Sequence, residues 1–268
     1  SGHDSIIELD SDDPGNDTLS GGAGNDWIDG AGGNDSVYDT SGADTIIGGA
    51  GNDTISSINS EGSPGSDSIM GGFGDDRIYS GSAGPDTVLG GEGNDSVAGS
   101  GGNDSLIEFD ADGTGNDTLD GGTGDDRLDG GNGNDFASYT NATGAVDVRL
   151  STSGSSGPDG VDELISIEGL IGSNNNDTLI GNDEANTLYG GDGADSMLGG
   201  GTAGGDYLDF GGGNDYYSYV TADLFGNQTL IGDGDFGNRE NDFIDGIGND
   251  TLDLGVGWVA GPDSGNDW

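Results

Sequence analysis

Aspartate carries the candidate chemistry of this chain, because it returns at a spacing of nine residues along much of the sequence. Each of these aspartates closes a glycine-rich hexapeptide; the stretch from Gly48 to Asp53, for example, reads GGAGND. Glycines at the first, second and fourth places allow the positive φ angles of a tight turn, which a Cβ would penalise. Such a turn aims several carbonyl oxygens inward, and the aspartate adds a carboxylate. A flexible, all-oxygen set of this kind is the ligand shell that calcium prefers.

The candidate metal ligands are therefore the aspartates at the sixth place of each unit. They are Asp17, Asp26, Asp35, Asp44, Asp53, Asp67, Asp76, Asp86, Asp95, Asp104, Asp117, Asp126, Asp135, Asp177, Asp195, Asp206 and Asp215. The spacing also includes Asp4, and it stops for 42 residues between Asp135 and Asp177. Asn186 holds the sixth place of one unit, and because an amide oxygen carries no charge we expect a weaker site there.

The three residues that follow each aspartate are long enough for one short strand. The middle residue of the three is apolar in all fourteen units of the first block. These residues are Ile6, Leu19, Ile28, Val37, Ile46, Ile55, Ile69, Ile78, Val88, Val97, Leu106, Leu119, Leu128 and Ala137. In a strand the middle side chain faces one way and its neighbours face the other. The alternation of turn and strand predicts an all-β solenoid with an apolar interior.

A longer period is superimposed on the nine-residue one. Steps of 13 or 14 residues precede Asp17, Asp67 and Asp117, which lie 50 residues apart. If two turns complete one coil of a flattened solenoid, this period of five turns places successive wide loops on opposite edges. Fourteen turns then give seven coils, which stack to about 34 Å at about 4.8 Å per strand.

Composition excludes several classes of protein. Only 29% of the 268 residues are hydrophobic, and the 61 glycines show no collagen period. With 52 acidic residues, four arginines, no lysine and a net charge of −48, the chain would repel nucleic acid and anionic membranes. Zero cysteines exclude disulfides and thiolate metal sites, and a single histidine excludes a histidine cluster. No apolar run is long enough to span a membrane, and residues 1–17 show no signal peptide.

Cations are expected to be required for folding. Low hydrophobicity combined with high net charge is typical of disordered chains. A bound metal supplies folding free energy, because the unfolded chain has no preformed site. We therefore expect calcium to convert this chain from a disordered to a folded state.

The spacing divides the chain into four parts. Residues 1–138 form the first calcium-binding block, and residues 174–217 form the second. Residues 139–173 carry alternating and clustered apolar residues such as Val146, Val148 and Leu164, and are expected to form metal-free β coils. Residues 218–268 hold degenerate repeats, which is typical of the cap of a solenoid.

An enzyme is the least favoured interpretation. His3 has no serine or cysteine arranged around it as a nucleophile, and neighbouring acids such as Asp75 and Asp76 lie on turns already assigned to metal. Asp10 and Asp233 begin stretches with a faint EF-hand pattern, but neither has Asp or Asn in the fifth place with Gly in the sixth and Glu in the twelfth.

The nonapeptides GGxGxDxUx, in which U is a large apolar residue, resemble those of the repeats-in-toxin (RTX) family, also called haemolysin-type calcium-binding repeats. The resemblance covers about residues 1–138 and 174–218, and the linker is similar to a block found between such arrays. It implies a right-handed parallel β-roll in which calcium lies between turns n and n + 2 of one edge. That rule allows about 10–15 calcium ions, which would cancel up to about 30 of the 48 net negative charges.

Two functions from different classes follow from this resemblance. In the first, the chain is a calcium-binding module of a secreted bacterial protein, exported unfolded through a type I channel, that folds in external calcium and stabilises or presents a larger protein. In the second, the array is a calcium-dependent cell-surface adhesin or structural layer. Both place the chain outside the cell, as an expected monomer whose partners are calcium ions and further domains of the same polypeptide.

Overall fold

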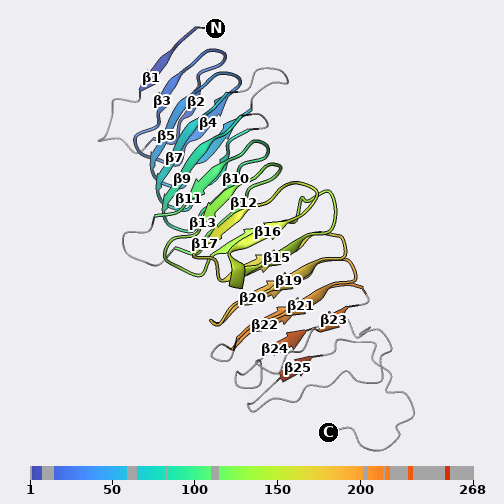
Figure 1. Cartoon of the computed structure of the whole chain (residues 1–268). Coiled ribbons are helices and arrows are strands. Elements are labelled where there is room, and N and C mark those ends of the chain that lie inside the picture. Colours follow the sequence, from blue (N-terminus) through green and yellow to red (C-terminus); the bar gives the residue numbers. More distant parts are fainter. Residues whose placement is uncertain are drawn as a thin grey trace, which may run out of the picture.

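The computed structural model describes residues 2–7, 15–58, 65–81, 84–109, 115–201, 205–213, 215–217, 229–231 and 251–253. Strands that follow one another along the first block alternate between two sheets, so two nine-residue units complete one coil (Figure 1). The 13-stranded sheet A runs in the order β1 (Ser5–Ile7), β3 (Trp27–Asp29), β5 (Thr45–Ala50), β7 (Ser68–Phe73), β9 (Thr87–Glu92), β11 (Ser105–Ile107), β13 (Arg127–Asp129), β17 (Glu163–Ile165), β16 (Gly154–Ser156), β15 (Asp147–Arg149), β19 (Thr178–Ile180), β21 (Ser196–Leu198) and β23 (Tyr216–Tyr217). The 12-stranded sheet B runs in the order β2 (Thr18–Ser20), β4 (Ser36–Asp39), β6 (Thr54–Ser57), β8 (Arg77–Tyr79), β10 (Ser96–Ala98), β12 (Thr118–Asp120), β14 (Phe136–Ser138), β18 (Gly169–Ile171), β20 (Thr187–Tyr189), β22 (Tyr207–Asp209), β24 (Thr229–Ile231) and β25 (Thr251–Asp253).

The interior is a stack of single aliphatic side chains, one from most of the strands whose side chains the structure describes. Parallel pairing sets Ile28 beside Ile46 in sheet A and Ile55 beside Ile78 in sheet B, and all four are fully buried. On either side of Ile55 the flanking strand residues are only half-buried, as expected for the alternation of a strand. The prediction of an all-β, parallel β-roll with an apolar column is confirmed.

The wide connections of the first block leave the coil on alternating edges. The connections from β1 to β2 and from β11 to β12 pass from sheet A to sheet B, whereas the one from β6 to β7 passes from sheet B to sheet A. This confirms the alternation predicted from the 50-residue period. The loop residues themselves, 8–14, 59–64 and 110–114, lie outside the described residues.

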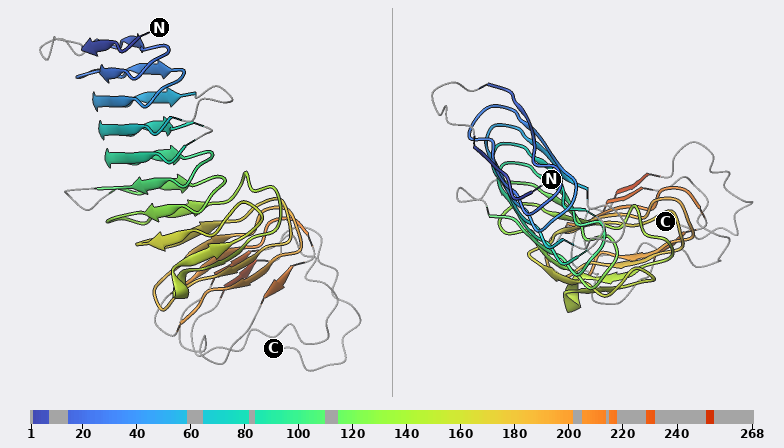
Figure 2. Two further views of the ribbon diagram at one scale, coloured as in Figure 1. Left: turned by 45° about the horizontal axis from the view of Figure 1, so that its top comes forward. Right: turned by 90° about the horizontal axis from the view of Figure 1, so that it is seen from above.

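The linker departs from a simple parallel coil. After β14 the chain forms β15, a short 3-10 helix η1 (Leu150–Thr152), β16 and β17, and β16 pairs antiparallel with both neighbours. Sheet A therefore gains three strands between β13 and β19, while sheet B gains only β18 between β14 and β20. The two blocks consequently meet at an angle, which is plain in the view from above (Figure 2). The antiparallel pairs of β16 are thus a local departure from the parallel roll that the resemblance implies.

The predicted linker core is present, and Val148, Leu164 and Leu170 are almost completely buried. Beyond β23 the structure describes only β24 and β25, so the cap predicted for residues 218–268 lies otherwise outside the described residues. Among the described residues no helix is long and apolar enough to cross a membrane.

Candidate metal sites

Backbone hydrogen bonds join the sixth-place aspartates into a ladder along each edge of the coil. The N–H of Asp26 donates to Oδ1 of Asp44 at 2.7 Å, and the N–H of Asp35 donates to Oδ1 of Asp53 at 2.8 Å. Each bond thus links one unit to the second unit after it, on the same edge. The acceptors are Asp26, Asp35, Asp44, Asp53, Asp67, Asp76, Asp86, Asp95, Asp104, Asp117, Asp126, Asp135, Asp195, Asp206 and Asp215.

The second carboxylate oxygen of many of these residues is buried and accepts no hydrogen bond from the described residues. This holds for Oδ2 of Asp17, Asp26, Asp35, Asp44, Asp53, Asp76, Asp104, Asp126 and Asp195. A buried ionised oxygen without a donor is costly unless a cation or a proton compensates it. The arrangement therefore leaves one position per turn for a positive charge.

The glycines of the turn keep this position open. A Cβ on the first-place Gly48 would overlap Oδ2 of Asp53, and a Cβ on Gly71 would overlap Oδ2 of Asp76. A Cβ on the fourth-place Gly51 would overlap the carbonyl oxygen of Gly33 in the preceding turn of that edge. Carboxylate and carbonyl oxygens thus converge where no side chain intrudes. A hard cation with oxygen ligands, such as calcium, fits this donor set.

Burial makes these carboxylates hard to ionise in the absence of a cation. Desolvation raises the pKa of Asp76 and of Asp104 to about 7, and the neighbouring ladder carboxylates add to both shifts. Desolvation is also the main cause that raises the pKa values of Asp53 and Asp126 to about 6. Without metal, the turns therefore compete for protons near neutral pH.

Some turns already supply donors to the sixth-place residue. Ser57 Oγ donates to Oδ2 of Asp67 at 2.6 Å. In the second block the N–H of Ser173 donates to Oδ2 of Asp177 at 2.6 Å, and Val146 N–H donates to its Oδ1.

The Asn186 amide is satisfied by the protein itself. Its Oδ1 accepts the N–H of Asn182 at 2.7 Å, and its Nδ2 donates to the carbonyl of Glu168 at 3.1 Å. No oxygen of this side chain is left with a demand for a cation. The expectation of a weaker site at Asn186 remains a prediction, and these bonds give it a geometric reason.

The structure reveals two further acids that the nine-residue spacing misses. Asp39 lies with Asp26 and Asp44, and Glu108 lies with Asp95 and Asp117; in each group, one oxygen per residue lies within 4.8 Å of the others. Asp39 stands five residues before Asp44, as Gly48 stands five before Asp53, so it replaces the first-place glycine. Aligning the turns by place, rather than following the aspartates alone, would have found it.

The linker also continues the ladder, although its spacing is irregular. The N–H of Asp126 donates to Oδ1 of Asp162 at 3.0 Å, and the N–H of Asp135 donates to Oε2 of Glu168 at 3.0 Å. Asp162 and Glu168 each precede an inward leucine by two residues, which is the signal that could have identified them. Oδ2 of Asp162 accepts hydrogen bonds from the hydroxyls of Tyr139 at 3.0 Å and Ser155 at 2.8 Å.

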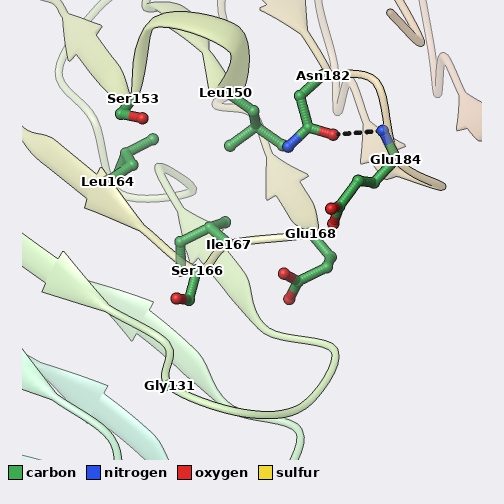
Figure 3. A pocket seen from close by; sticks show the side chains of 9 residues that line it. All are labelled: Gly131, Leu150, Ser153, Leu164, Ser166, Ile167, Glu168, Asn182 and Glu184. Atoms are coloured by element: carbon green, nitrogen blue, oxygen red, sulfur yellow. Dashed lines mark hydrogen bonds between the residues drawn. The ribbon is translucent and has the colours of Figure 1, made fainter. Parts of the chain in front are cut away.

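A pocket of about 310 Å³ lies at the linker, where Glu168 and Glu184 approach each other (Figure 3). Leu150, Leu164 and Ile167 form its apolar side. Burial is the main cause that raises the pKa of Glu168, and the Glu184 charge contributes.

Comparison with known proteins agrees with this geometry. The profile of the RTX calcium-binding nonapeptide repeat matches residues 11–38, 29–57, 61–82, 79–106, 111–137 and 171–203, which together make up more than half of the chain. No curated protein matched. The matched segments contain the ladder aspartates of the first block and, in the second block, Asp177 and Asp195, whereas residues 138–170 of the linker are not matched. The chain therefore belongs to the family of RTX calcium-binding nonapeptide repeat proteins.

Proposed function

We propose that this chain is a calcium-binding module of a secreted bacterial protein, which folds on binding calcium outside the cell and stabilises or presents a larger protein. The observation that carries the proposal is the row of buried Oδ2 atoms without a hydrogen-bond donor among the described residues. A stack of such oxygens repels itself, and a divalent cation shared between turns n and n + 2 reverses that repulsion.

The seventeen aspartates from Asp17 to Asp215 named above are the proposed ligands, together with carbonyl oxygens of the turns. About 10–15 ions are expected, because each ion needs two turns of the same edge. The number falls where a turn supplies its own donors, as Ser173 does for Asp177.

The linker is proposed to be free of metal. Oδ1 of Asp162 accepts a backbone N–H, and its Oδ2 accepts two hydroxyl hydrogen bonds. A carboxylate satisfied in this way needs no cation. The buried apolar residues of the linker supply stability at all calcium concentrations, so we expect it to join the two blocks and to help nucleate them.

Extracellular calcium-binding modules typically have dissociation constants of about 10⁻⁴–10⁻³ M. Affinity in this range would leave the chain unfolded in a calcium-poor cytosol and folded after export. The proposed location is therefore extracellular or on the cell surface, and no enzymatic activity is proposed for the chain.

A calcium titration followed by far-ultraviolet circular dichroism tests the proposal. We expect disordered spectra in chelator, β spectra in millimolar calcium, reversal when chelator is added back, and little response to magnesium, which demands rigid octahedral geometry. Equilibrium dialysis of the folded protein counts the ions. Full β structure in excess chelator at neutral pH would contradict the proposal.

A further inference from the structure

Asp39 occupies a place in the turn that glycine holds in most units. It is the last residue of β4 and pairs in register with Ser57 of β6, which holds the same place in a later turn. The side chains of Asp39 and Ser57 differ in their hydrogen-bonding chemistry. Ser57 brings a hydroxyl that donates to Asp67, whereas Asp39 brings another carboxylate toward Asp26 and Asp44.

All three carboxylates of this cluster are removed from solvent. Asp26, Asp39 and Asp44 are 4%, 1% and 2% exposed, and one oxygen of each lies within 4.8 Å of one oxygen of each other residue. Two of them belong to consecutive turns of one ladder, since the N–H of Asp26 donates to Asp44 Oδ1 at 2.7 Å. Asp39 therefore adds a third acid to an existing pair.

Each carboxylate has one satisfied and one unsatisfied oxygen. Backbone N–H groups of Asp4, Asp26 and Thr40 donate to Oδ1 of Asp26, Asp44 and Asp39, at 2.7, 2.7 and 2.8 Å respectively. Oδ2 of each is buried, and no N–H or hydroxyl of the described part of the chain donates to it; a proton shared between the Asp39 and Asp44 carboxyls is the alternative compensation for those two. Because the sequence has no lysine, and the arginine ion pairs among the described residues involve other acids, a bound cation is the natural compensation for this cluster.

A related cluster lies on the other edge of the coil. Asp95 and Asp117 precede strands of sheet B, whereas Asp26 and Asp44 precede strands of sheet A. Glu108 approaches Asp95 and Asp117 from the first place of a turn, as Asp39 approaches its own pair. The same arrangement thus occurs twice, and in the second cluster the place of Asp39 is taken by Glu108, whose side chain is one methylene longer.

We infer that Asp39 is a third carboxylate ligand of the cation held between Asp26 and Asp44, which makes this the tightest cation site of its edge. The inference rests on the proposed calcium binding. Affinity at oxygen-ligand sites rises with the number of charged ligands, and a third carboxylate favours trivalent lanthanides even more strongly than calcium.

Terbium luminescence provides a local probe, because Trp27 directly follows Asp26 in the chain. Terbium bound in this turn is excited by energy transfer from the indole. Subtracting the terbium emission of the Trp27→Phe variant from that of the wild type removes the emission sensitised by Trp258 and Trp268. We expect Asp39→Asn, which keeps the Oδ1 acceptor for Thr40, to raise the terbium concentration at half-maximal Trp27-dependent emission about tenfold.

Asp39→Gly restores the residue that most turns carry and is expected to show the same shift. Asp75→Asn is the matched control: it removes one charge from an exposed fifth-place residue and should leave the half-saturation point unchanged. Circular dichroism in saturating calcium checks that each variant folds. If either folded Asp39 variant half-saturates at the wild-type concentration, the inference is overturned while the proposed function stands. Absence of calcium-dependent folding in the wild type would overturn both.

Discussion

The hydroxyl of Ser57 donates a 2.6 Å hydrogen bond to Oδ2 of Asp67, at the place that glycine leaves open in most other turns. Ser57 is fully buried, so the donor is not replaced by water when it is removed. We expect Ser57→Ala to lower the free energy of unfolding in saturating calcium by about 1–3 kcal/mol. Urea unfolding measures the change. Ser56→Ala, on the half-buried face of the same strand, is the control, and an equal effect of both variants would contradict the role of the hydroxyl.

Replacing Asn186 with aspartate should create an additional metal site. The amide nitrogen that donates to the Glu168 carbonyl becomes a carboxylate oxygen facing it, so the turn gains a demand for a cation. We expect Asn186→Asp to bind about one more calcium ion, counted by equilibrium dialysis. Asn176→Asp adds the same charge at an exposed position and should leave the count unchanged. Equal counts for both variants would show that the Asn186 turn cannot take a cation.

Protons should substitute partly for calcium. Several ladder carboxyls have pKa values of about 6–7 in the metal-free fold, against 3.8 for an ordinary aspartate. The folded state therefore binds more protons than the unfolded state between about pH 4 and pH 7, and its stability falls as pH rises through that window. In chelator we expect β structure to be greatest near pH 4 and lost near pH 7.

Calcium binding should show the opposite trend, because protons and calcium compete for the same oxygens. The calcium concentration at half-maximal folding is expected to rise as pH is lowered from about 8 to 5. Circular dichroism at several pH values measures both curves. A metal-free chain that gains stability as pH rises would contradict the raised pKa values.

The aliphatic column should contribute strongly to folding. Ile55 is fully buried between the two sheets, and its removal leaves a cavity that neighbouring turns cannot fill. We expect Ile55→Ala to lower the free energy of unfolding by about 2–5 kcal/mol and to raise the calcium midpoint. Thr54→Ala, one residue earlier on the outer face, should change it by about 0.5 kcal/mol or less. Comparable losses would show that the column is not the core.

Tyr139 offers a test of the linker that leaves the calcium turns intact. Its hydroxyl donates to Oδ2 of Asp162 at 3.0 Å. Tyr139→Phe should lower the free energy of unfolding by about 1–3 kcal/mol without changing the number of bound calcium ions. A gain of one calcium ion would instead show that Asp162 Oδ2, with the Ser155 hydroxyl as its remaining donor, recruits metal.

The regular parts of the fold were predictable because each unit repeats the same local solution. Asp53 marks the turn and Ile55 marks the inward strand residue, so position within the unit fixes which side chains are buried, and the alternation of successive units fixes the edge. The alternation of the wide loops followed from the odd number of units between Asp17, Asp67 and Asp117. These features depend on local spacing, which a single sequence contains.

The linker and the extra acids were not predictable in the same way. The antiparallel pairing of β16 with β15 and β17 depends on contacts between segments that no short period relates. Asp39 and Glu108 lie outside the aspartate spacing, and their meaning appears only when the coil brings them against the ladder of the same edge. The sequence does contain one signal for them: each is an acidic residue at the first place of a turn, where most units have glycine.

The ladder has a direction, and this gives the coil unlike ends. Every bond runs from an amide of one unit to a carboxylate further along the chain, as from Asp35 to Asp53. At the sixth-place aspartates, a section through the stack therefore leaves backbone amides without acceptors on the surface facing the C-terminus and carboxylates without donors on the surface facing the N-terminus. The coil is polar in the way that a filament is polar. A protein that closes it must present carboxylates at one end and amides or cations at the other.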